Sequence, residues 1–407
     1  MKESTMEMLE KYGQTHLLEY YNVLDDQARK SMDYQLAKLD WHLLDLLEHP
    51  EERQKRGEIA PIGALSIEEI REHASEYTQE GLAAIRAGKV GALLLAGGQG
   101  TRLGCQGPKG VYNIGETHEL YIFELLFKNT LDVVRQAGDW IPFFIMTSDR
   151  NHNETVLFLN EHHFFGYNPD YVFFFKQEMA PAVDFNHKLL MEKPDRLALS
   201  PNGNGDWFSS FAHAGLLERA KKMGIEWLNA FAVDNVLQRI ADPCFIGAVI
   251  RNGCVSGAKV VRKADPEERV GALCLEDGKP SIIEYYEMTH EMNYAKGEDG
   301  KYLYSYGVIL NYLFRLDRLE AIADAYLPIH MVEKKIPYID PDGICHSPET
   351  PNGYKIETLI LDMVHLMDNC LAYEVERERE FAPVKNKEGI DSVETARELL
   401  KKNGVEL

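Results

Sequence analysis

A glycine-rich stretch beside two basic residues carries the clearest chemical signal in the sequence. The stretch 93–110 reads LLLAGGQGTRLGCQGPKG, in which an apolar run leads into Gly97, Gly98, Gly100 and Gly104. Glycines after a buried strand let the backbone approach a phosphate, and the N-terminus of the next helix adds N–H donors. A plain strand-to-helix turn could need the same glycines. Arg102 and Lys109 favour the phosphate site, because they place two cations beside the loop.

The charge of the whole chain makes those two cations more informative. Its 407 residues include 44 Lys and Arg against 65 Asp and Glu, which gives a net charge of −21. Such a chain repels polyphosphate backbones and anionic membranes, so we expect neither nucleic acid nor a membrane as partner. A phosphate ligand must therefore meet locally placed cations or a metal ion.

Two familiar phosphate motifs do not fit the glycine stretch. A P-loop requires Ser or Thr after its lysine, but Gly110 follows Lys109. The glycines form G-x-G-x-x-x-G instead of the dinucleotide pattern, and the first acid that ends a second strand, Asp149, comes much too late for ribose binding. A dinucleotide-dependent oxidoreductase is therefore only a minor alternative.

The elements that would position the loop alternate between strand and helix. Nearly continuous apolar runs, rich in aromatic and β-branched residues, predict strands buried on both faces at 90–96, 141–148, 171–177 and 227–234. Helical patterns lie between them at 120–135 and 210–223. This alternation predicts a doubly wound α/β sheet.

The remaining parts of the chain show other patterns. Residues 1–88 have helical spacing, with a capping box from Ser66 to Glu69. From about residue 257 the pattern favours strands, with a hairpin turn at Asp277–Gly278. The tail from about 355 returns to a helical pattern, and its charge run at 374–380 is expected to be a solvated face.

The glycine string L-x-x-A-G-G-x-G-T-R-L-G-x-x-x-P-K-G resembles the signature of the eukaryotic-type UDP-sugar pyrophosphorylases, and among them is most similar to UDP-N-acetylglucosamine pyrophosphorylases. Other stretches follow in family order, among them FFFKQEMAPA, SPNGNGDW, VDNVLQRIADPCFIG, PNGYKIE and YEVEREREFAPVKN. The resemblance implies an α/β fold: a Rossmann-like nucleotidyltransferase domain with a mixed central sheet, an N-terminal helical segment and a short C-terminal α+β part. The corresponding segments are 1–88 (helical), 89–325 (catalytic uridylyltransferase domain) and 326–407 (contributing phosphate-binding lysines).

The activity implied by the resemblance is uridylyl transfer. UTP and a sugar 1-phosphate, with N-acetylglucosamine 1-phosphate favoured, would give a UDP-sugar and pyrophosphate, with Mg²⁺ as cofactor. The alternatives are a UDP-glucose or UDP-galactose pyrophosphorylase and, as a non-enzyme, a nucleotide-sugar sensor. Six cysteines without C-x-x-C spacing and the lack of a long apolar run lead us to expect a cytoplasmic protein with reduced thiols.

The resemblance also assigns site residues by position. The catalytic cations are Arg102 and Lys109, and Asp234, the last residue of the fourth predicted strand, is the Mg²⁺ ligand. The nucleotide-binding residues are Leu95, Ala96, Gly97, Gly98, Gly100, Thr101, Gln177, Gly203 and Lys355. The sugar-phosphate-binding residues are Asn204, Asp234, Gly271, Glu284, Tyr285 and Lys385.

The residue types alone leave plainer roles open for several of these positions. Asp234 could be an ordinary helix cap, and Gln177 or Glu284 could be polar surface. Lys355 and Lys385 could be surface lysines, which is the usual case.

Two departures from the family pattern concern the sugar pocket. The segment 305–308, Ser-Tyr-Gly-Val, stands where the family has an N-A-G-N-like stretch, and Leu359 and Leu361 stand where acetylated-sugar enzymes have aromatic residues. Both positions bear on N-acetylhexosamine against plain hexose phosphates and leave uridylyl transfer unaffected. Family members also usually continue into a further β segment, so we carry no oligomeric state over to this chain.

Overall fold

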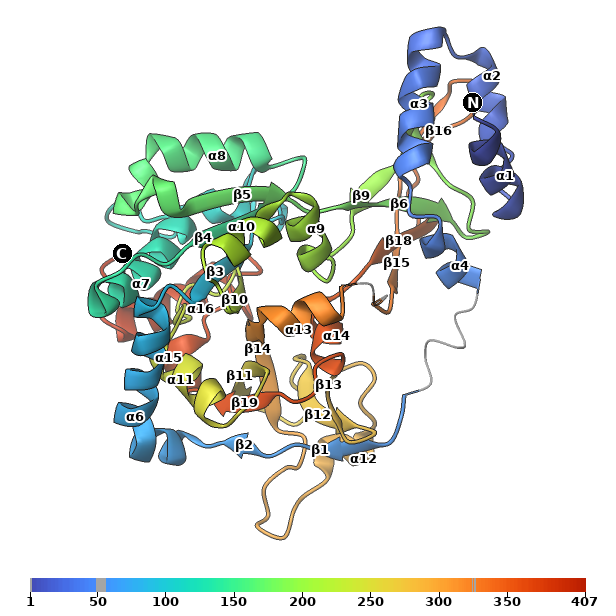
Figure 1. Ribbon diagram of the computed structural model, residues 1–407. Coiled ribbons are helices and arrows are strands. Elements are labelled where there is room, and N and C mark those ends of the chain that lie inside the picture. Colours follow the sequence, from blue (N-terminus) through green and yellow to red (C-terminus); the bar gives the residue numbers. More distant parts are fainter. Residues whose placement is uncertain (1, 49–55, 324, 326) are drawn as a thin grey trace. The chain divides into compact units, whose positions relative to one another are not determined.

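The computed structural model describes residues 2–48, 56–323, 325 and 327–407 (Figure 1). The chain forms two compact units, each built from three separate stretches. The larger unit comprises residues 57–177, 207–325 and 361–407, and the smaller unit comprises 1–56, 178–206 and 326–360. Each of the three sequence segments thus contributes to both units. In the described part of the chain, no helix combines the length and the apolar character that a membrane crossing needs.

The larger unit is built on a mixed sheet in the strand order β2-β19-β11-β14-β10-β3-β4-β5. Strands β10, β3, β4 and β5 are parallel neighbours, whereas β14 runs antiparallel to both β10 and β11. The strands of this path are β2 (Ala64–Leu65), β3 (Val90–Leu95), β4 (Phe143–Thr147), β5 (Val172–Lys176), β10 (Trp227–Ala232), β11 (Ser256–Arg262), β14 (Tyr306–Arg315) and β19 (Leu371–Glu374). The expected α/β fold with a mixed central sheet is confirmed.

The helices of the larger unit follow the predicted alternation closely. They are α6 (Ile67–Arg86), α7 (Ile122–Ala137), α8 (His152–Glu161), α9 (Trp207–His213), α10 (Leu216–Lys222), α11 (Pro243–Arg251), α12 (His290–Tyr294), α13 (Leu316–Ala321), α14 (Ile360–His365), α15 (Arg377–Glu380) and α16 (Val393–Lys402). The predicted helix at 210–223 is split into α9 and α10 by Gly215, which has a positive φ of 75°. The capping box at Ser66 and Glu69 opens α6 as expected.

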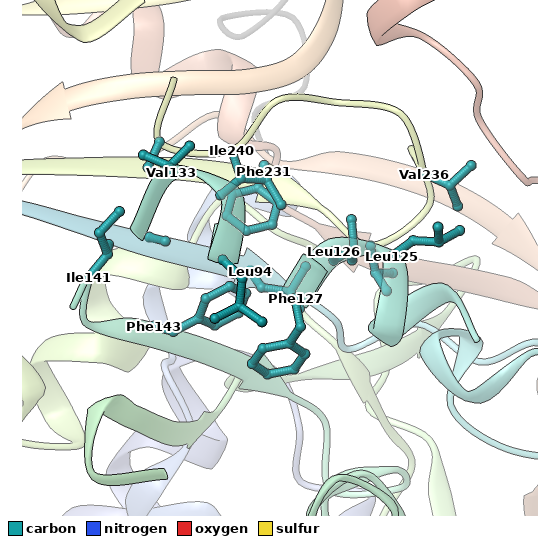
Figure 2. Close-up of a cluster of buried hydrophobic side chains, with 14 of the residues drawn as sticks. Leu94, Leu125, Leu126, Phe127, Val133, Ile141, Phe143, Phe231, Val236 and Ile240 are labelled. Atoms are coloured by element: carbon teal, nitrogen blue, oxygen red, sulfur yellow. The ribbon is translucent and has the colours of Figure 1, made fainter. Parts of the chain in front are cut away.

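The main hydrophobic core lies where α7 packs on the parallel strands (Figure 2). Every residue of β3 and β10 is buried, which explains why these strands are apolar without alternation. Phe143 of β4 links the two layers: its ring stacks on Phe127 of α7 at 4.8 Å and meets Phe231 of β10 edge-on at 6.0 Å. This core fixes the carboxyl ends of β3, β4 and β10, from which the candidate site projects.

Strands at the edge of the larger unit include the predicted hairpin. It consists of β12 (Ala272–Glu276) and β13 (Lys279–Ile283), and β1 (Ile59–Pro61) pairs with β12. Asp277 and Gly278 both have positive φ, 50° and 78°, as a two-residue hairpin turn requires. Strands β1 and β2 interrupt the stretch 1–88, which the sequence pattern predicted as helical.

The C-terminal tail departs further from expectation. Two strands, β18 (Gly353–Glu357) and β19, lie in the region predicted as helix. The charge run at 374–380 is not a simple solvated face, since Glu374 and Glu380 are 5% and 8% exposed. Their charges are met by cations of β11: Arg262 lies 2.7 Å from Glu374, and Lys259 lies 2.6 Å from Glu380. That prediction was wrong because the partners are more than 100 residues away in sequence.

Among its described residues, the smaller unit packs helices from the start of the chain against short strands. The helices are α1 (Glu3–Lys11), α2 (Leu17–Val23), α3 (Asp26–Lys38) and α4 (His42–Glu48). A four-stranded sheet has the order β15-β18-β6-β9, with β6 (Met179–Asp184), β9 (Leu199–Pro201) and β15 (His330–Lys334). Two small ladders add β7 (Met191–Lys193) with β8 (Arg196–Leu197), and β16 (Tyr338–Ile339) with β17 (Cys345–His346). Their common core joins residues as distant as Leu9, Val183 and Ile356.

Candidate functional site

The glycine loop folds back on itself directly after β3. The backbone N–H of Gly100 donates to the carbonyl of Gly107 at 2.8 Å, and the N–H of Lys109 donates to the carbonyl of Gly98 at 3.2 Å. Two short 3₁₀ turns, Thr101–Leu103 and Lys109–Val111, complete the loop. Leu95 and Ala96 form its buried base, whereas Thr101 and Arg102 are exposed. The loop is therefore a closed backbone turn with one cation near each end.

Side chains that follow the neighbouring strands β4 and β5 contact this loop. Gln177, directly after β5, is buried against Gly97 so closely that a Cβ at position 97 would lie 2.5 Å from its Oε1. Asn151, at the start of α8, donates from Nδ2 to the carbonyls of Ala96 at 2.9 Å and Gly98 at 3.3 Å. Asn151 was not among the predicted residues. Its signal in the sequence is an asparagine just after a buried strand, which resembles any helix cap.

Four of the predicted charged residues come together in the larger unit. Burial lowers the pKa of the half-buried Lys109, and the Asp234 carboxylate opposes this shift. The cations Lys385 and Arg102 lower the pKa of Lys109 further. Lys109, Asp234 and Lys385 are far apart in sequence, so their interaction is produced by the fold. The result is a locally cationic site in a strongly acidic chain.

Asp234 and Lys385 lie on two backbone segments that pair with each other. The N–H of Val384 donates to the carbonyl of Asp234 at 2.8 Å, and the N–H of Val236 donates to the carbonyl of Ala382 at 3.3 Å. The Lys385 ammonium also lies 3.1 Å from the Asp391 carboxylate. A carboxylate and an ammonium are thus presented from adjoining loops.

Three of the predicted sugar residues, Gly271, Glu284 and Tyr285, adjoin the β12–β13 hairpin. The N–H of Val308 donates to the carbonyl of Gly271 at 2.9 Å. A Cβ at Gly271 would lie 3.6 Å from both Glu284 Oε2 and Val308 Cγ2. Tyr285 is 42% exposed and meets Tyr286 edge-on at 5.3 Å. Gly271, Glu284 and Val308 therefore form one small polar-apolar patch.

Three predicted residues, Gly203, Asn204 and Lys355, belong to the smaller unit. Asn204 Oδ1 accepts the N–H of Ile360 at 2.9 Å. Gly203 bridges to Thr358 with a positive φ of 78°, and a Cβ there would lie 2.2 Å from the Thr358 carbonyl oxygen. Lys355 lies on β18, paired between β15 and β6.

Next to this segment, Asp206 is half-buried and Asn202 donates to its carboxylate. Burial and the Glu178 charge raise the pKa of Asp206 to about 6. Sequence reasoning missed Asp206, which stands in the quoted SPNGNGDW stretch, because nothing local signals its burial.

Within the described residues, no cluster of three or more His, Cys, Asp or Glu side chains is arranged to hold a metal ion.

A parallel-strand fold in which a cation-flanked glycine loop follows a core strand defines an α/β protein of the phosphate- and nucleotide-binding type. The family described as UTP–glucose-1-phosphate uridylyltransferase matches residues 45–402, and the chain belongs to this family.

Individual relatives support the same assignment. A mouse protein named UDP-N-acetylhexosamine pyrophosphorylase-like protein 1 is 37% identical over 409 residues, covering 94% of this chain and 80% of the relative. The UDP-N-acetylglucosamine pyrophosphorylase of Saccharomyces cerevisiae is 38% identical over 357 residues, covering 84% and 74%. The crystal structure of the Trypanosoma brucei uridine diphosphate N-acetylglucosamine pyrophosphorylase superimposes with a TM-score of 0.83 at 26% identity, covering 97% and 83%.

Proposed function

We propose that this chain is a UTP:sugar-1-phosphate uridylyltransferase that releases pyrophosphate, with N-acetylglucosamine 1-phosphate as the favoured acceptor. The observation that carries the proposal is the cluster of Arg102, Lys109, Lys385 and Asp234 beside the glycine loop. The relatives named for UDP-N-acetylglucosamine and UDP-N-acetylhexosamine support the choice of sugar. We also propose that the enzyme is cytoplasmic. Its substrates, UTP and a sugar 1-phosphate, are soluble anions.

Catalysis in this proposal rests on positioning and charge. The sugar 1-phosphate is already an anion, so its oxygen attacks the α-phosphorus of UTP without a general base, and pyrophosphate leaves. Lys109 and Arg102 hold the triphosphate, Gln177 reads the uracil, and Lys385 holds the acceptor phosphate. Because burial disfavours the charged form of Lys109 in the free protein, an arriving triphosphate stabilises that ammonium strongly.

Asp234 is the residue that would hold Mg²⁺. In phosphate chemistry Mg²⁺ keeps several waters and takes one or two carboxylates together with substrate oxygens, so a single carboxylate beside cations that attract phosphates fits this ion. When bound, Mg²⁺ neutralises charge on the phosphate oxygens. The sugar contacts proposed for Asn204, Gly271, Glu284 and Tyr285, and the phosphate contact of Lys355, remain predictions.

A plain hexose phosphate is the second candidate, and Val308 favours it. Its Cγ2 methyl lies beside Gly271 in the same patch as Glu284, and a valine side chain offers no hydrogen bond to an acetamido group. A missing hydrogen bond can decide between related substrates.

The test is pyrophosphate release from UTP and Mg²⁺ with the 1-phosphates of N-acetylglucosamine, N-acetylgalactosamine, glucose and galactose. We expect the fastest release with N-acetylglucosamine 1-phosphate. Preference for glucose or galactose would assign the second candidate, and Val308→Asn would then shift the preference toward the acetylated sugars. UTP binding without release from any of the four would contradict the enzyme and favour a nucleotide-sugar sensor.

A further inference from the structure

Asn235 ties together the two segments that carry Asp234 and Lys385. Its Nδ2 donates to the carbonyl of Glu380 at 2.7 Å, and its Oδ1 accepts the N–H of Ala382 at 2.9 Å. The side chain is 1% exposed. An uncharged amide can donate from its nitrogen and accept at its oxygen at the same time. Both ends of the side chain are thus used on one segment, immediately before Lys385.

A buried ion cluster contacts the same segment through Glu380. Lys259 of β11 is fully buried, and its Nζ lies 2.6 Å from Glu380 Oε2 and 3.0 Å from Asp242 Oδ2. Burial raises the pKa of Asp242, but Lys259 and Arg239 outweigh this and hold that pKa below its ordinary value. Charges buried this deeply are expensive to desolvate and are poor devices for stability alone. Glu380 belongs both to this cluster and to the segment that leads to Lys385. The cluster therefore helps to fix the position of that segment.

We propose that Asn235, supported by the Lys259–Glu380 ion pair, is a positioning residue that sets the distance between the Asp234 carboxylate and the Lys385 ammonium. This inference rests on the proposed function. In that function Asp234 would hold the Mg²⁺ that neutralises phosphate charge, and Lys385 holds the phosphate of the sugar 1-phosphate. The side chain of Asn235 points into the protein and bonds to backbone, so it acts through its neighbours. A small error in the relative placement of reacting phosphates costs up to about 100-fold in rate.

Asn235→Ala tests this role, with Asn229→Ala as the matched control. Asn229 is also a buried amide with three hydrogen bonds, to Asn311, to the carbonyl of Tyr312 and from the N–H of Ala241, and none of these reaches residues 380–385. We expect Asn235→Ala to lower kcat about 10- to 100-fold and to raise KM for the sugar 1-phosphate. Calorimetric titration of UTP without acceptor and without Mg²⁺ should give an unchanged Kd, because the glycine loop does not depend on Asn235.

The control separates positioning from stability. Asn229→Ala should lower Tm by a similar amount while keeping kcat within about 2-fold, because a lost buried amide costs stability at either site. The milder Asn235→Ser, which retains a hydroxyl that can make one bond, should give an intermediate kcat and covers the case in which Asn235→Ala does not fold.

Three results would overturn the inference. They are an Asn235 variant with normal kcat, an equal loss of kcat in Asn229→Ala at equal Tm, and a rise in the Kd for UTP as large as the change in kcat. Failure of the proposed function is a separate result, because the unmodified protein itself would then release no pyrophosphate.

Discussion

The glycine loop and the paired loops at 234–236 and 382–385 both present cations in the larger unit, but they are built differently. The glycine loop closes through its own backbone, and neighbouring side chains such as Gln177 occupy the space that a Cβ would need. The paired loops are held by buried polar and charged side chains, Asn235, Lys259 and Glu380. A loop of the first kind is sensitive to added volume, whereas one of the second kind is sensitive to lost partners.

The largest effect on stability is expected at the ion cluster. Lys259→Met removes the ammonium between two buried carboxylates, and breaking a buried ion pair in this way costs about 3–5 kcal/mol of unfolding free energy. Urea unfolding measures the loss. Lys401→Met, which removes an exposed pair with Glu116, should hardly change the unfolding free energy because solvent screens that pair. Equal losses for the two variants would contradict a special contribution of the buried ion cluster to stability.

On activity, the largest effect is expected at Lys109. Lys109→Ala removes one charge contact to the triphosphate and should lower turnover about 100- to 1000-fold. Its unfolding free energy should hardly fall, because burial already disfavours the ammonium. Lys128→Ala, in an exposed pair with Glu124, is the control and should keep turnover within about 2-fold. Near-normal turnover of Lys109→Ala would contradict the assignment of the loop.

Asp206 of the smaller unit is a half-buried carboxyl whose charged neighbours, Glu178 and Asp40, are also acidic. Its folded-state pKa, about 6, is above the ordinary value of 3.8, so the protonated form stabilises the fold. That stability is complete below pH 4 and is lost as the pH rises through 6. Asp206→Asn should therefore gain up to about 2–3 kcal/mol over the unmodified protein at pH 8.

Denaturation of both proteins at several pH values checks this prediction. The difference in unfolding free energy should grow between pH 4 and pH 7 and then level off. A difference that is constant with pH would show that the Asp206 carboxyl has an ordinary pKa.

The smallest of the expected effects concerns volume in the glycine loop. In Gly97→Ala the added methyl lies 2.5 Å from Gln177 Oε1, so one of the two must move, and we expect UTP affinity to fall about 10-fold. The double variant Gly97→Ala/Gln177→Ala tests whether the contact with Gln177 causes this loss. In the Gln177→Ala background, the added methyl should lower UTP affinity much less than it does alone. Additive effects would mean that the two residues do not interact.

Local patterns predicted the sheet of the larger unit well. Apolar runs placed β3, β4, β5 and β10 within two residues, because strands buried on both faces must be apolar throughout. The turn at Asp277–Gly278 was equally predictable, since few residue pairs accept positive φ at both positions.

Features that depend on distant partners could not be predicted in this way. Glu380 in an acidic run resembles any exposed glutamate until Lys259 is placed against it. Asn151 and Asp206 likewise gain their surroundings only from the fold. The two-unit division was invisible because no change in composition marks residues 178–206 or 326–360 as belonging with the first helices.

The core of the smaller unit imposes an order on synthesis. Leu9, Leu17 and Leu36 bury their side chains together with Ile329 and Ile356, so the first helices leave the ribosome about 300 residues before their last core partners. At translation speeds of about 5–20 residues per second, the apolar faces of these helices remain without those partners for roughly 15–60 s. Over that interval the apolar side chains of α1–α3 lack the last partners of their native core.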